Sequence, residues 1–189
     1  PKLKLIALDP ANGKERWKFD PFEDKQATGV NRGVTYWEEE EDKRIYFSAG
    51  HYLYAINAND GTVITSFGNN GKVDLRSGLG RDSSRLTVWA TSPGVTFKDL
   101  LIQGTALGEG YDAAPGFVRA YNLKTGKIAW TFHTIPQPGE FGYDTWSENA
   151  YKEVGGTNSW AGMSLDEARG IVYIPTGSPA FDFYGGNRK

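Results

Sequence analysis

Residues 7–19 read Ala-Leu-Asp-Pro-Ala-Asn-Gly-Lys-Glu-Arg-Trp-Lys-Phe, and this thirteen-residue phrase returns twice without a gap. The second copy, at residues 55–67, reads Ala-Ile-Asn-Ala-Asn-Asp-Gly-Thr-Val-Ile-Thr-Ser-Phe. The third, at residues 120–132, reads Ala-Tyr-Asn-Leu-Lys-Thr-Gly-Lys-Ile-Ala-Trp-Thr-Phe. A repeated unit of strand, glycine turn and strand is typical of radially stacked sheets. The sequence therefore predicts an all-β chain, a partial β-propeller of antiparallel four-stranded blades.

Each copy of the phrase has a glycine in its seventh position, where a tight hairpin needs the positive φ that glycine takes without steric cost. In the first and third copies a tryptophan follows, at Trp17 and Trp130. A large flat side chain at a fixed place in each blade is expected to dock on the neighbouring blade. The second copy has Thr65 there, so that junction is predicted to be weaker or to be packed by Phe67.

The composition excludes several functional classes. The chain of 189 residues has a formal net charge of −2, which gives nucleic acid no basic face to bind. It contains no cysteine, so disulfides, thiolate catalysis and cysteine-ligated zinc are excluded. No apolar run approaches the roughly 20 residues that a membrane helix needs. The acidic run at residues 38–42 lies between two strand patterns and is predicted to be a solvated hairpin tip.

The rest of the chain is organised as paired strands joined by short polar turns, and no helix is predicted. The expected hairpins join residues 45–48 to 52–57, 94–97 to 100–103, 117–121 to 128–132, and 159–166 to 171–175. A polar, glycine-rich stretch at residues 68–86 lengthens the second repeat interval, as a binding loop or as surface decoration. About three to four blades are predicted, fewer than the four to eight that typically close a propeller. Residues 1–189 are therefore expected to be one partial propeller of a longer chain.

Three segments that interrupt the repeat resemble the catalytic quinoprotein dehydrogenases, eight-bladed propellers that carry pyrroloquinoline quinone (PQQ). They are Asn31-Arg-Gly-Val-Thr-Tyr-Trp37, Gly104-Thr-Ala-Leu-Gly-Glu109, and Gly156-Thr-Asn-Ser-Trp160 followed by Pro175-Thr-Gly-Ser178. With residues 67–75, the likeness covers essentially the whole chain and is closest to the glucose or polyol branch. Methanol-oxidising relatives carry adjacent cysteines before the first segment, whereas this chain has Gln26 and Ala27.

The resemblance implies that Arg32, Thr105 and Trp160 bind PQQ. The residue chemistry agrees, because an indole face stacks on a planar ring and a guanidinium fork suits a carboxylate or a quinone oxygen. Thr105 would hydrogen-bond the cofactor. From the residues alone, the alternatives are that Trp160 is a packing residue of the propeller and that Arg32 forms a surface ion pair.

The resemblance also implies a Ca²⁺ ion held by Glu109 and by the residue at position 178. Calcium takes six to eight oxygen ligands, which a carboxylate between two glycines can supply. Glu109 is otherwise an exposed loop acid. Ser178 departs from the family, which usually has an asparagine there, so the site uses water or backbone at this point or has lost its metal.

The implied function is oxidation of a sugar, polyol or alcohol, with hydride transfer to PQQ and Ca²⁺ as Lewis acid. A membrane quinone or a cytochrome would accept the electrons, in the periplasm. The catalytic aspartate of the family lies in a later segment, so no catalytic residue is expected in this chain and the isolated fragment is expected to be inactive. The alternative is a noncatalytic propeller that binds proteins, of the outer-membrane assembly type, which predicts repeats without the three interrupting segments.

Overall fold

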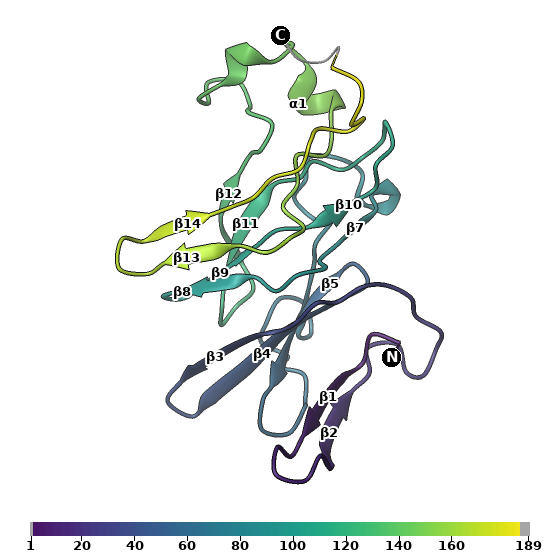
Figure 1. Ribbon diagram of the computed structural model, residues 1–189, viewed down its shortest axis with the longest axis vertical. Coiled ribbons are helices and arrows are strands. Elements are labelled where there is room, and N and C mark those ends of the chain that lie inside the picture. The colour runs from purple at the N-terminus through teal and green to yellow at the C-terminus, as the bar shows by residue number, and fades with distance from the viewer. Residues whose placement is uncertain (1, 186–189) are drawn as a thin grey trace.

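Antiparallel strands make up most of the regular elements in the computed structural model, which describes residues 2–185 (Figure 1). The strands are β1 (Leu5–Leu8), β2 (Glu15–Phe19), β3 (Thr35–Glu39), β4 (Asp42–Ala49), β5 (Tyr52–Asn57), β6 (Lys72–Asp74), β7 (Val88–Trp89), β8 (Val95–Phe97), β9 (Leu100–Gln103), β10 (Ala106–Leu107), β11 (Val118–Asn122), β12 (Ile128–Phe132), β13 (Ser164–Asp166) and β14 (Ile171–Tyr173). The predicted all-β class is confirmed.

Two of the sheets are four-stranded, with the orders β3-β4-β5-β6 and β12-β11-β9-β8. The hairpins β1-β2 and β13-β14 flank them in the chain, and β7 pairs with β10. All of these strand pairs are antiparallel, and the predicted hairpins β4-β5, β8-β9, β11-β12 and β13-β14 are confirmed. The acidic run forms the tip of the β3-β4 hairpin, where Glu39 pairs with Asp42, as predicted.

The first repeat junction is built by Trp17, which packs on the glycine turn of the second copy of the phrase. The indole Nε1 donates a hydrogen bond to the Ala58 carbonyl, at 3.1 Å. A Cβ on Gly61 would lie 2.6 Å from a ring carbon of Trp17, and Gly61 has φ +77°. Glycine is therefore required there for both space and backbone conformation, and the predicted docking of Trp17 is confirmed.

The second junction joins the second copy of the phrase to the third. It lacks a tryptophan, and the residues that follow Thr65 pack it instead. The Gly68 amide donates to the Thr125 carbonyl at 2.9 Å. Phe67 is fully buried, and its ring centre lies 5.5 Å from that of Tyr46. The Tyr46 hydroxyl in turn donates to the Leu123 carbonyl at 2.6 Å. Packing by Phe67, one of the two predicted solutions, is the one found.

Trp130 lies on β12 with 36% of its surface exposed, and Ile128 and Phe132 on the same strand are exposed as well. Docking of Trp130 on a following blade stays a prediction.

The stretch at residues 68–86 is not surface decoration, because three leucines anchor it in the largest core cluster. Leu75, Leu79 and Leu86 are each at most 6% exposed. The Arg119 guanidinium, itself buried, donates to the carbonyls of Leu75 and Ser77 and ties the stretch to β11. None of these residues lines the candidate functional cavity described below.

The prediction of no helix is wrong in the irregular stretch at residues 134–158. Here α1 (Ala150–Glu153) forms a single turn, and 3₁₀ turns lie at Tyr143–Thr145 and, earlier in the chain, at Ser83–Arg85. Ala150 and Val154 bury against Ile135. One helical turn is too short to produce a 3.6-residue apolar period, so the pattern gives no signal. Within residues 2–185, no helix has the length and apolar character to cross a membrane.

Candidate functional site

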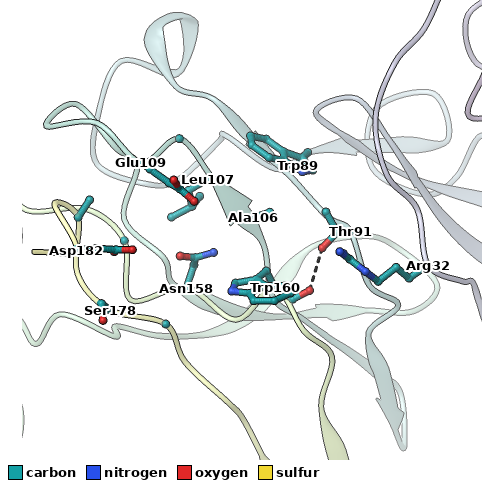
Figure 2. A pocket seen from close by; sticks show the side chains of 14 residues that line it. Arg32, Trp89, Thr91, Ala106, Leu107, Glu109, Asn158, Trp160, Ser178 and Asp182 are labelled. Carbon is teal, nitrogen blue, oxygen red and sulfur yellow. Dashed lines mark hydrogen bonds between the residues drawn. The ribbon is translucent and has the colours of Figure 1, made fainter.

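A cavity of about 330 Å³ opens where the segments that interrupt the repeat meet (Figure 2). It is lined by Arg32, Trp89, Thr91, Ala106, Leu107, Gly108, Glu109, Gly156, Asn158, Trp160, Gly177, Ser178, Ala180 and Asp182. Its volume suits a small organic ligand. All three segments predicted from the sequence contribute to this one cavity.

Arg32 and Trp160 meet in the cavity, with the guanidinium carbon 5.6 Å from the centre of the indole ring. Thr91 links them: its carbonyl accepts the Arg32 amide at 2.8 Å, and its hydroxyl donates to the Trp160 carbonyl at 2.9 Å. The Ser92 hydroxyl donates to the same carbonyl at 2.8 Å. These two hydrogen bonds fix the Trp160 backbone. The residue nevertheless remains 49% exposed, which leaves surface for a ligand.

The turn that carries Arg32 is shaped by its asparagine neighbour. The Asn31 side-chain amide donates to the Ser48 carbonyl at 2.9 Å, and its oxygen accepts the Gly33 amide at 2.9 Å. Such local side-chain bonds are a usual way for asparagine to hold a turn. The Asn-Arg-Gly sequence therefore places the arginine through the residues on either side of it.

The loop that carries Glu109 begins with a close approach of two backbones. A Cβ on Gly104 would lie 2.2 Å from the Ser159 carbonyl oxygen, so only glycine fits there. Thr105 is 3% exposed and is not among the residues that line the cavity. Its carbonyl accepts a hydrogen bond from the Asn158 side chain at 2.8 Å. A direct bond from Thr105 to a cofactor stays a prediction.

The oxygen-bearing side chains gather at the end of the cavity away from Arg32 (Figure 2). Glu109 and Ser178, both predicted as metal ligands, line it together with Asn158 and Asp182. Carboxylate, amide and hydroxyl oxygens are donors that Ca²⁺ prefers. No three His, Cys, Asp or Glu side chains cluster within residues 2–185, so the donor set is mixed. It fits a hard cation beside the aromatic and cationic end of the cavity.

The sequence reasoning missed four lining residues with polar or aromatic side chains: Trp89, Thr91, Asn158 and Asp182. Asn158 lies inside a segment that was singled out, between Gly156 and Trp160, and its amide was the signal that went unused. Asp182 follows Ser178 in the same loop and offers a carboxylate in place of a hydroxyl. No sequence motif marks Trp89 or Thr91, since Trp89 lies on the short strand β7 and Thr91 lies just after it.

The family model described as the PQQ "Glucose/ethanol/alcohol dehydrogenase, beta-propeller domain" matches residues 1–189. The chain belongs to this quinoprotein dehydrogenase family. It is 31% identical to the glycerol dehydrogenase large subunit of Gluconobacter oxydans (strain 621H), over 98% of this chain and 26% of that protein. It is also 31% identical to quinoprotein glucose dehydrogenase A of Acinetobacter calcoaceticus, again over 98% of the chain and 26% of the relative.

Solved structures of quinohemoprotein alcohol dehydrogenases share the fold of this quinoprotein propeller. ADHIIG from Pseudomonas putida HK5 superposes with a TM-score of 0.73 at 28% identity, over 95% of this chain and 26% of that one. The enzyme from Comamonas testosteroni gives 0.72 at 23% identity, over 94% and 27%, and shows the fold alone. The chain thus spans about a quarter of the length of these relatives.

Proposed function

We propose that this chain supplies the PQQ-binding part of a dehydrogenase that oxidises a sugar, a polyol or another alcohol. The observation that carries the proposal is the cavity in which Arg32, Trp160 and Glu109 meet, from three segments far apart in the sequence. A planar tricarboxylated cofactor needs an aromatic platform, a fixed cation and a hard metal ion. The cavity holds residues suited to each of these needs, on a family background of PQQ-dependent enzymes.

Each residue has a distinct role in the proposal. Trp160 offers its exposed indole face as the platform on which a planar ring stacks. Arg32 directs a planar fork of donors at a carboxylate or quinone oxygen from the cofactor's edge. The acidic end of the cavity holds Ca²⁺. When bound, PQQ supplies the hydride acceptor and Ca²⁺ the Lewis acid that polarises its carbonyl. The base that takes the substrate proton is proposed to be an aspartate beyond Lys189.

Substrate, acceptor and compartment extend the same proposal. The relatives are named for glycerol, glucose and alcohol, so the substrate class proposed is a sugar, a polyol or another small alcohol. A membrane quinone or a cytochrome is proposed as electron acceptor, and the periplasm as the compartment. The isolated residues 1–189 are proposed to lack turnover, because the proton acceptor is not among them.

Dye reduction tests the proposal. The full-length protein is loaded with PQQ and Ca²⁺ and assayed with glucose, glycerol and ethanol. Turnover that Trp160→Ala and Arg32→Ala abolish is the expected result. Arg16→Ala is the matched control, because Arg16 is an exposed arginine that pairs with Asp9 in the first hairpin. Full activity in both cavity variants, or no turnover with any of the three substrates in folded wild-type protein, would contradict the proposal.

A further inference from the structure

The side chain of Asn158 has a defined orientation in the cavity. Its Nδ2 donates to the Thr105 carbonyl at 2.8 Å. A carbonyl oxygen can only accept, so the amide end that faces Thr105 must be the NH₂ group. The Asn158 Oδ1 is therefore turned the other way, and Figure 2 shows it directed to the side on which Glu109 and Asp182 lie.

The loop that carries Asp182 is tied by its backbone to the segment that carries Asn158. The Gly177 amide donates to the Asn158 carbonyl at 3.0 Å, and the Thr157 amide donates to the Ser178 carbonyl at 2.9 Å. The Ala180 amide adds a third such bond, to the Gly155 carbonyl at 3.0 Å. Because the two segments are held together, the Asp182 carboxylate and the Asn158 amide oxygen face one another from neighbouring backbones (Figure 2).

Two carboxylates in this cavity have no cation to balance them among the residues that the structure describes. Neither Glu109 nor Asp182 forms an ion pair within residues 2–185. Within residues 2–185, Arg32 is the one cationic side chain that lines this cavity, and it lies against Trp160 at the opposite end. Facing carboxylates repel unless a positive charge lies between them. The Ser178 hydroxyl, by contrast, points away from Asn158 in Figure 2.

We infer that Asn158 and Asp182 join Glu109 as side-chain ligands of the cation, and that Ser178 is not a ligand. The inference rests on the proposed function, which places a cation in this cavity. Asn158 supplies the amide oxygen that the serine at position 178 cannot, from the neighbouring segment. Two carboxylates and an amide give a charge of −2 and hard oxygen donors, as a divalent or trivalent ion of calcium's size requires.

Terbium luminescence measures this site without any turnover. Tb³⁺ is a calcium-sized probe, and Trp160 and Trp89 line the same cavity, so excitation of tryptophan should sensitise bound Tb³⁺. The full-length protein is titrated without PQQ, and Ca²⁺ is then used to displace the Tb³⁺. Asp182→Asn and Glu109→Gln are each expected to weaken binding about tenfold or more, since each removes a charged ligand. Ser178→Ala is expected to stay within about twofold.

Asn158 is tested with two variants, because its amide also ties the Thr105 loop. Asn158→Ala is expected to weaken Tb³⁺ binding, while Asn158→Asp keeps an oxygen ligand and is expected to bind Tb³⁺ at least as tightly as wild type. Circular dichroism establishes that each variant is folded. Asp166→Asn is the matched control, since Asp166 pairs with Arg169 in the β13-β14 hairpin, outside this cavity.

The outcomes separate the inference from the proposed function. Loss of binding in Ser178→Ala with wild-type affinity in Asp182→Asn would overturn the inference, as would an absence of Tb³⁺ binding by folded wild-type protein. An effect of Asp182→Asn no larger than that of Asp166→Asn would also overturn it. If the expected variant pattern appears while PQQ fails to bind, the cation ligands stand and the proposed function falls.

Discussion

The guanidinium carbon of Arg32 lies 5.6 Å from the centre of the Trp160 ring, although the two residues come from segments far apart in the sequence. Thr91 holds both, through its carbonyl to the Arg32 amide and its hydroxyl to the Trp160 carbonyl. The geometry of the proposed PQQ platform is thus set by a residue that has no motif of its own. Arg32 and Trp160 are positioned as a pair by Thr91, and the Ser92 hydroxyl adds a second bond to the Trp160 carbonyl.

Removing the Thr91 hydroxyl should therefore loosen Trp160. Thr91→Val is expected to weaken PQQ binding about fivefold, the equivalent of one neutral hydrogen bond of about 1 kcal/mol. Thr91→Ser keeps the hydroxyl and should restore the affinity to near wild type. Equilibrium dialysis of PQQ against the full-length protein measures both variants. Equal affinities for the valine and serine variants would show that the hydroxyl does not position the platform.

Arg32 should not be replaceable by lysine. Arg32→Ala is expected to weaken PQQ binding about tenfold or more, because a charged hydrogen bond is lost. Arg32→Lys should recover only part of this, since an ammonium is a point charge without the planar fork. The same dialysis measures both, with raised salt as a second variable. Full recovery by lysine would mean that charge alone, and not the fork, is what binds.

The junction of Trp17 with Gly61 predicts strong coupling between two substitutions. Gly61→Ala places a methyl 2.6 Å from a ring carbon of Trp17 and also strains a backbone with φ +77°. Part of its cost should therefore disappear when the indole is removed. In a double-mutant cycle measured by urea unfolding, the coupling free energy is expected to be about 1–3 kcal/mol. Additive effects of Trp17→Ala and Gly61→Ala would mean that the ring does not dock on the turn.

Tyr46 makes the stability of the second junction sensitive to alkaline pH. Burial raises the pKa of the Tyr46 hydroxyl above its ordinary value of 10. A pKa that is higher in the folded state means that its stabilising contribution is complete below pH 10 and is lost as the pH rises beyond it. Tyr46→Phe is expected to cost about 1 kcal/mol at neutral pH, from the lost bond to the Leu123 carbonyl.

The same variant should lose less stability than wild type between about pH 8 and about pH 11, because phenylalanine does not titrate. Urea unfolding at the two pH values measures the difference. Some alkaline loss should remain, since burial also raises the pKa of Tyr54 and Tyr121. An identical pH dependence in wild type and Tyr46→Phe would show that Tyr46 does not carry this effect.

The fold could be predicted from the sequence because the signals that specify it are local. Gly61 and Trp17 stand at fixed places in a repeated phrase, and the hairpin turns lie between adjacent strand patterns, so each feature is decided within a few residues. The helix α1 was not predicted because a single turn is too short to show a helical period of apolar residues. The packing of Phe67 at the second junction was left as one of two options, since Thr65 shows only that a tryptophan is missing.

The candidate site, too, has residues that local sequence signals predict and residues that only the structure brings to it. Arg32, Trp160 and Glu109 stand in segments that interrupt the repeat, and the structure brings all three to one cavity. The orientation of Asn158 depends on a hydrogen bond to Thr105, which lies in another segment. The approach of Asp182 depends on backbone bonds between two loops. Contacts across segments leave no trace in spacing, so these two residues emerged only from the assembled structure.

Direct binding of PQQ to the full-length protein, with and without Trp160, tests the central claim most directly. The account predicts that folded wild-type protein binds PQQ in equilibrium dialysis. It also predicts that Trp160→Ala weakens this binding at least about fivefold, because stacking of a planar heterocycle on an aromatic side chain contributes about 1–3 kcal/mol. No binding by the folded wild-type protein, or equal binding by wild type and Trp160→Ala, would contradict it.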